Sequence, residues 1–282
     1  MDLWGFQRDK DRNEEIKMTK FLRKLADEKA PVFWCLSMLV FMILGYKSFS
    51  TAFLGKTGYT YDVAFLRLAL LLMVILMMRE IYQGEFCFNF RTKNFVKGLL
   101  FSWPLLLFIV LNLLGTDFSR PIVLDGLVMA LTENAIVGLY EEVLVRGFLV
   151  GHMMYHWKDD SRKVFKSVLW SSVIFGVLHL GNIFSGRGVG ATLFQVCYST
   201  IIGVLFAAVY IRTKNLWIVA ILHGIIDFAG SIETIFQTPQ AVPQNVAGGG
   251  SMNLAAIIIL SIVLLIALLW SLFLLRKKKL VS

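Results

Sequence analysis

The chain has 282 residues, of which 57% are hydrophobic and 17% are charged. Soluble domains contain about half apolar and about a quarter charged residues, so this composition excludes an ordinary soluble domain and indicates an integral membrane protein. The net charge of +9 does not indicate nucleic-acid binding, because the basic residues lie between apolar runs and form no aromatic-rich polar face.

Apolar runs that could cross a bilayer as helices, at about 20 residues each, occur eight times along the chain. In order, they cover residues 32–53, 63–78, 96–114, 122–155, 164–184, 191–211, 216–236 and 254–275. The fourth run is too long for one perpendicular span, so it must tilt, break or leave the membrane at its end. We therefore predict an all-α fold, a polytopic transmembrane helix bundle of about eight spans.

Lysine and arginine are concentrated in alternate connections and in both tails, which predicts that both termini are cytoplasmic. Residues 1–31 are expected to form a cytoplasmic or membrane-surface segment. Residues 32–276 form the bundle, with a functional core at about 122–236, and residues 277–282 form a basic tail. The predicted location is a cell membrane, in a multi-pass arrangement.

Among the charged residues within the predicted spans are Glu141, Glu142, Arg146 and Asp227. A charge at the centre of a membrane helix costs about 2.5 to 3.5 kcal/mol on insertion scales. Such residues usually face the interior of the bundle or a watery cavity and serve a function. These four residues are therefore the first candidates for a functional site.

The glutamate pair in the fourth run has members with different expected environments. Glu142 and Arg146 are four residues apart on a helix, so they are predicted to form an ion pair. Glu141 lies about 100° around the helix from Glu142, which leaves it free to act as a general base. The alternative is a charge-neutralising triplet at the cytoplasmic end of a span.

Two further motifs add histidines to this set. His179 ends the motif Phe175-x-x-x-His179 in the fifth run, and His223 precedes Asp227 by one helical turn in the seventh. Either histidine could instead be a satisfied core residue, and His223 with Asp227 could be a local neutral pair. Two histidines and several carboxylates on three apolar helices nevertheless favour one convergent site.

Such a site could use two kinds of chemistry. In one, Glu141 with His179 deprotonates a water, while His223 and its neighbour stabilise an oxyanion. In the other, the histidines and a carboxylate bind zinc, which polarises the water. Because no HExxH motif is present, a standard zincin site is disfavoured. We predict that no cofactor is used, with zinc as the alternative.

Three motifs in order, Glu141-Glu142-x-x-x-Arg146, Phe175-x-x-x-His179 and His223-x-x-x-Asp227, resemble those of the CAAX protease and bacteriocin-processing family, also named the CPBP or Abi family. The eight predicted spans are similar to the prenyl-protein endopeptidase branch. The resemblance implies a glutamate-dependent intramembrane endopeptidase, although many members are labelled metalloproteases.

The resemblance also implies a role for each matching residue. Glu141 would activate water with His179 as its partner, Glu142 and Arg146 would support the cavity, and His223 with Asp227 would form the oxyanion side. Phe175 is expected to contact the substrate. The prenyl-protease branch usually has asparagine at the position of Asp227, and a carboxylate donates a hydrogen bond only when it is protonated. Asp227 could therefore orient His223 instead.

Aspartate at position 227 is similar to what bacterial members show, so the expected membrane is the bacterial plasma membrane, with the site in its cytoplasmic half. The predicted function is endoproteolysis of a membrane-associated or lipid-anchored peptide, such as a prenylated C-terminus, a bacteriocin or pheromone precursor, or a span remnant. The partners would be this substrate and the lipid bilayer. The alternatives are a non-enzymatic bacteriocin immunity or scaffold protein and an ion-coupled transporter.

Overall fold

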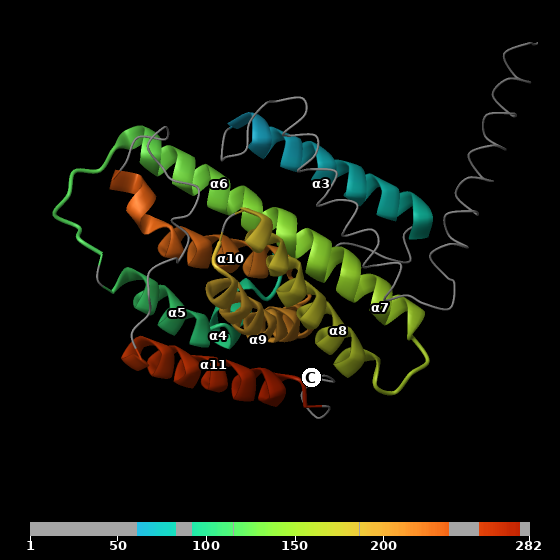
Figure 1. Ribbon diagram of the computed structural model, residues 1–282. Helices are drawn as coiled ribbons and strands as arrows, with labels where there is room; N and C mark the ends of the chain where they lie inside the picture. The colour runs from blue at the N-terminus through green and yellow to red at the C-terminus, as the bar shows by residue number, and fades with distance from the viewer. Residues whose placement is uncertain (1–60, 83–91, 115, 186, 237–253, 277–282) are drawn as a thin grey trace, which may run out of the picture.

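The structure is a computed structural model that describes the chain except for residues 1–60, 83–91, 115, 186, 237–253 and 277–282 (Figure 1). Every regular element in the described residues is helical, and no strand occurs among them. The predicted all-α class is therefore confirmed for this part of the chain. The predicted first span, at 32–53, the segment 1–31 and the tail 277–282 lie outside the described residues.

The described elements form nine α-helices and three helical segments of other types. The α-helices are α3 (Tyr61–Tyr82), α4 (Phe95–Phe101), α5 (Pro104–Leu113), α6 (Leu124–Glu142), α7 (Gly151–His156), α8 (Lys163–Leu178), α9 (Val189–Thr213), α10 (Leu216–Gly230) and α11 (Leu254–Leu274). A π-helix, η1 (Val143–Val150), joins α6 to α7, and two 3₁₀-helices, η2 (His179–Ser185) and η3 (Ile232–Phe236), follow α8 and α10. Helix α3 packs against α6, while α11 packs against α5 and α9 on the opposite side of the bundle (Figure 1).

Several of these helices can cross a membrane. Within the described residues, three helical segments are long and apolar enough for a span, at Lys163–Ile183, Val189–Thr213 and Ala255–Leu274. The bent pair α4 and α5 provides a fourth if it is counted as one span, whereas Val63–Leu76 and Leu216–Gly230 are apolar but shorter. The chain is thus an integral membrane protein by composition and structure. The count of eight spans and the orientation of the termini stay predictions.

The third predicted span is not one continuous helix. Helices α4 and α5 meet at an angle of 68°, with the break at Ser102 and Trp103. Pro104 begins α5, and a proline has no backbone N–H and its ring clashes with the preceding turn of a helix. At the break, the Ser102 backbone N–H and hydroxyl both donate to the Gly98 carbonyl, at 3.0 and 2.8 Å. These two bonds satisfy polar groups at the bend.

The fourth predicted span runs from α6 through η1 into α7 without a break (Figure 1). Its middle section, Val143–Val150, is a π-helix. This form is rare in proteins, and where it occurs it is frequently at a functional site. All eight residues of η1 are buried, including Arg146. The segment therefore lies inside the bundle with protein around its whole circumference, directly after the glutamate pair.

Glycines allow α6 and α10 to approach closely. A β-carbon placed on Gly138 would lie 2.6 Å from both the Ala220 carbonyl oxygen and the Gly224 nitrogen. A β-carbon on Gly224 would lie 2.8 Å from the Asn134 carbonyl oxygen. Small residues permit such backbone contact between membrane helices. This contact sets α6 and α10 side by side one turn before Glu142 and beside His223.

We expect Gly138→Ala to destabilise the protein, because the added methyl group would press on backbone atoms of α10 that cannot move independently. Overpacking of this kind typically costs about 1 to 3 kcal/mol. Gly190→Ala is the matched control, since a β-carbon there meets no heavy atom within 4 Å. Thermal unfolding of the two purified variants in detergent should show a lower melting temperature for Gly138→Ala only. Equal melting temperatures would contradict the close contact.

The start of α10 is fixed by a reciprocal pair of hydrogen bonds. The Asn94 side-chain amide donates to the Thr213 carbonyl at 3.1 Å, and the Asn215 amide donates to the Lys93 carbonyl at 3.1 Å. Asn215 also caps α10, because its side-chain oxygen accepts from the Ile218 N–H at 3.2 Å. These bonds set the register of α10, and through it the position of His223.

Candidate active site

The carboxylate of Glu142 lies at the centre of a fully buried polar cluster. Its Oε1 accepts from Arg146 at 2.6 Å, and the same oxygen lies 2.7 Å from Nδ1 of His223. Arg146 also donates to the Gly203 carbonyl at 3.1 Å. The predicted Glu142–Arg146 ion pair is thus confirmed. One carboxylate connects the α6–η1 segment to α10, and its arginine partner extends the link to α9.

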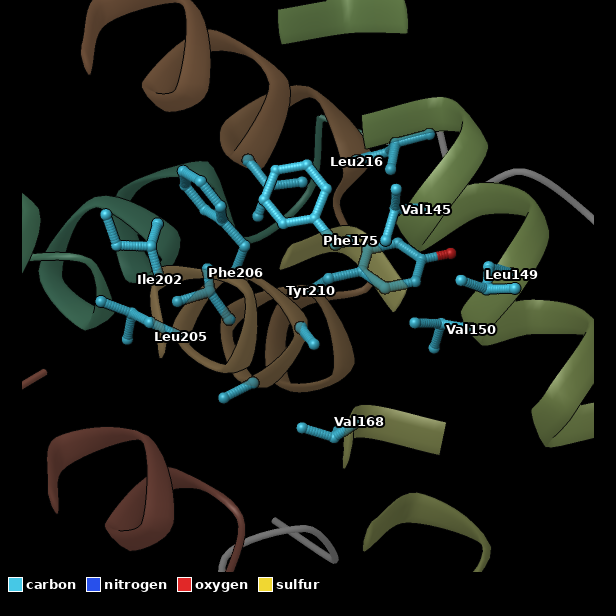
Figure 2. Close-up of a cluster of buried hydrophobic side chains, with 14 of the residues drawn as sticks. Val145, Leu149, Val150, Val168, Phe175, Ile202, Leu205, Phe206, Tyr210 and Leu216 are labelled. Carbon is cyan, nitrogen blue, oxygen red and sulfur yellow. The ribbon is translucent and has the colours of Figure 1, made fainter. Parts of the chain in front are cut away.

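The His223 ring is clamped by aromatic side chains. Phe206 stacks on it with a centroid distance of 5.4 Å, and Phe175 meets it edge-on at 5.8 Å. The same two rings lie 4.8 Å (Phe175) and 5.3 Å (Phe206) from the Arg146 guanidinium carbon. Figure 2 shows Phe175 and Phe206 within one buried cluster beside the helix that carries Val145. This packing fixes both the imidazole and the guanidinium against Glu142.

The second nitrogen of His223 faces two carboxylates that are more open. Nε2 lies 3.4 Å from Oδ2 of Asp227 and 3.7 Å from Oε2 of Glu141. The side chains of Glu141 and Asp227 are 34% and 35% exposed, whereas that of Glu142 is 0% exposed. Because Nδ1 faces the acceptor Glu142, it carries a proton, and Nε2 is the nitrogen presented to the open part of the site.

His179 lies at the junction of α8 and η2. Its Nδ1 lies 2.9 Å from the Phe175 carbonyl oxygen, which can only accept, so Nδ1 carries the proton and Nε2 is left as an acceptor. Its ring meets the Phe175 ring edge-on at 5.0 Å. Phe175 therefore contacts both histidines.

The three predicted motifs thus converge, while the predicted action of His179 with Glu141 on a water stays a prediction. The imidazole within 4 Å of Glu141 is that of His223, and in the described residues no close contact joins Glu141 to His179. Phe175 is only 4% exposed, with its ring packed on both histidines and on Arg146. The predicted substrate contact of Phe175 stays a prediction, and the packing favours a positioning role.

Some residues of the site carried no indication in the sequence. Helix α9 contributes Phe206 and the carbonyl of Gly203, neither of which differs from ordinary apolar packing residues in the printed sequence. Asn134 donates to the Ser231 hydroxyl at 3.0 Å, and this hydroxyl donates to the Asp227 carbonyl at 2.8 Å. An asparagine in an apolar run could have drawn attention to this link between α6 and the end of α10.

No group of three or more histidine, cysteine, aspartate or glutamate side chains in the described residues is arranged to hold a metal ion. Both Nδ1 atoms already face acceptors, at Glu142 and at the Phe175 carbonyl. An Nδ1 that faces an acceptor leaves Nε2 of the same ring open, so the choice between a cofactor-free site and zinc stays a prediction.

Fold and site together define a helical membrane protein with a buried glutamate, arginine and histidine centre. Residues 123–229 match the model of the family described as "Type II CAAX prenyl endopeptidase Rce1-like". The matched segment contains every motif residue from Glu141 to Asp227, so the resemblance to the CAAX protease and bacteriocin-processing family is confirmed over residues 123–229. No curated protein and no solved structure matches the chain.

Proposed function

We propose that the protein is an intramembrane endopeptidase in which Glu141 activates the water that attacks the peptide bond. The observation that carries this proposal is the different surroundings of two adjacent glutamates. Glu142 is buried and held by Arg146 and His223, whereas Glu141 is one-third exposed beside Nε2 of His223. One carboxylate is therefore committed to structure, and the other can reach water and substrate.

The reaction follows from these positions. Glu141 accepts a proton from a water molecule, whose oxygen attacks the scissile carbonyl carbon. The electron pair of the carbonyl moves to its oxygen, and His223 donates to the developing oxyanion from Nε2. Glu141 then returns the proton to the leaving amine as the C–N bond breaks. His179, with Nε2 as an acceptor, helps to hold the water.

Asp227 has an orienting role in this scheme. Its Oδ2 lies 3.4 Å from Nε2 of His223, one turn along α10. An ionised carboxylate cannot donate to an oxyanion, but it stabilises a charged imidazole and favours a proton on Nε2. This supports the interpretation that Asp227 acts through His223 and not directly on the substrate.

The substrate class follows from the family description, which names a CAAX prenyl endopeptidase. We propose a membrane-associated peptide or protein with a prenyl anchor as the substrate, cut near the cytoplasmic face of a bacterial plasma membrane. The exposed apolar side chains of α8 and α9 on the bundle surface, such as Trp170 and Leu193, suit contact with lipid chains.

Comparative peptidomics of membranes that contain the wild-type chain or Glu141→Gln tests this function. Glutamine has the shape of glutamate but accepts no proton at neutral pH, so cleavage should fall by at least about 10²-fold. Peptide fragments that depend on the wild-type chain should disappear with the variant. Asp125→Asn, an exposed carboxylate at the start of the same helix, is the matched control. Identical fragments from wild type and Glu141→Gln would overturn the mechanism. A binding or transport protein would give this result.

A further inference from the structure

A second polar cluster lies next to the glutamate and histidine centre, on η2, the link that follows it and the first turns of α9. It consists of Asn182, Arg187, Gln195 and Tyr198. The Asn182 side-chain amide donates to the Gln195 side-chain oxygen at 2.9 Å, and the Arg187 backbone N–H donates to the Asn182 carbonyl at 3.1 Å. The Tyr198 hydroxyl interacts with the side chains of both Arg187 and Gln195. The four residues therefore form one connected unit.

This cluster is continuous with the active site. Helix η2 begins at His179, and Asn182 follows one 3₁₀ turn later, a rise of about 6 Å. Asn182 also bonds to Gln195 of α9, so η2 connects the cluster to the site in which Glu141 and Asp227 are the open carboxylates.

The charges divide this region into two parts. Glu141 and Asp227 are partly exposed acids, and the buried cation Arg146 is already bound to Glu142. Arg187 adds a cation of intermediate burial beside Tyr198. An anionic group of a bound peptide is repelled from Glu141 and Asp227 and attracted to Arg187. The peptide is therefore oriented by charge.

The side chains of this cluster suit a carboxylate. A guanidinium presents a planar set of N–H groups that matches the two oxygens of a carboxylate, and such charge-assisted bonds are stronger than neutral ones. Tyrosine hydroxyl and glutamine amide groups add donors beside it. In an apolar bundle, a carboxylate on the substrate needs such partners, because an unpaired buried charge is costly.

We propose that Arg187, supported by Tyr198, Gln195 and Asn182, binds a carboxylate of the peptide that is cut at the glutamate and histidine centre. This inference rests on the proposed endopeptidase function and adds a specificity determinant to it. The carboxylate can be the C-terminus of the substrate or an acidic side chain near it. Both sources offer the same chemistry to Arg187.

The test uses a synthetic peptide with an S-farnesyl cysteine followed by three aliphatic residues, and the full-length chain in liposomes. Three versions of the peptide are compared: one with a C-terminal acid, one with a C-terminal amide, and an amide whose last residue is glutamate. Loss of a hydrogen bond to a charged group corresponds to about a 10- to 100-fold change, so the acid should show a kcat/KM higher than the amide by this factor. If kcat/KM of the amide peptide that ends in glutamate returns to that of the acid, a side-chain carboxylate can also bind to Arg187.

Arg187→Gln should lower cleavage of the acid to the rate of the amide and leave the amide rate unchanged. Arg187→Lys, which keeps the charge without the planar fork, should show an intermediate preference. The matched control is Arg120→Gln, since Arg120 pairs with Glu233 away from this cluster and should keep the full preference. This dependence on one carboxylate separates a binding role from a merely structural one.

The outcomes distinguish this site from the proposed function. Equal cleavage of acid and amide by the wild-type chain would overturn the carboxylate site and leave the protease function intact. Binding is measured separately, by fluorescence anisotropy of labelled peptides on Glu141→Gln. An acid preference in binding, with no cleavage of any version by the wild type, would overturn the function and keep the site. If the peptides are neither bound nor cleaved, both the carboxylate site and the protease function are overturned.

Discussion

Replacing Arg146 with methionine is expected to destabilise the protein so strongly that little folded protein is recovered. The guanidinium is 0% exposed and donates to Glu142 and to the Gly203 carbonyl. Without it, the Glu142 carboxylate stays buried with one cationic partner fewer. Breaking a buried pair in this way typically costs about 3 to 5 kcal/mol, a large part of the about 5 to 15 kcal/mol by which proteins are stable.

Fluorescence-detected size-exclusion chromatography of tagged variants, with melting curves of the recovered protein, measures this effect. The double variant Glu142→Gln with Arg146→Met removes both charges and should be more stable than Arg146→Met alone, because no unpaired charge remains. The glutamine side chain introduced in the double variant can still accept a hydrogen bond from His223. A single variant with the wild-type melting temperature would show that the ion pair does not hold this part of the bundle.

The second large effect is expected when either histidine of the site is replaced. The two variants should lose activity to a similar extent, but only one of them should lose stability. His223→Asn and His179→Asn are each expected to lower kcat/KM by about 10²- to 10⁴-fold, the usual range for a group that transfers or holds a proton. His223→Asn should also lower the melting temperature, because Glu142 loses its partner at 2.7 Å. His179→Asn should not, because among the described residues the one hydrogen bond of His179 joins it to the carbonyl of Phe175, one turn earlier.

Both histidine variants are measured on the same peptide in liposomes, with melting curves from the same preparations. Replacing His156, a partly buried histidine at the end of α7, with asparagine is the control and should leave the peptide rate unchanged. Full activity in His223→Asn or in His179→Asn would remove that residue from the mechanism. Equal loss of stability in both would contradict the different surroundings seen in the structure.

The parts of the site that could be predicted from the sequence are those where burial is costly. Charged residues in apolar runs need partners, so Glu142 and Arg146, four residues apart, could be paired without a structure. The same reasoning brings the helices of Glu141, His179 and His223 to one place. What the sequence does not show is the rotation of each helix about its own axis. For this reason the contact of Glu141 with the ring of His223, at 3.7 Å, could not be predicted from the sequence.

Other features depend on backbone geometry that apolar composition does not encode. The bend between α4 and α5 has a visible cause in Pro104, but a count of apolar residues alone merges both helices into one run. Helix α9 holds Arg146 through the backbone carbonyl of Gly203, a group that every residue possesses. Such contacts arise from tertiary packing, and no residue type identifies them in advance.

The π-helix at Val143–Val150 holds more residues than an α-helix of the same length would, between two halves of one continuous helix. Loss of one residue here would let the segment relax to α geometry, and the residues after it, such as the buried His152, would keep their side of the bundle. The same loss within the α-helical part, α6, would turn everything after it by about 100°. A change of chain length is therefore tolerated better in this segment than in the helix that precedes it.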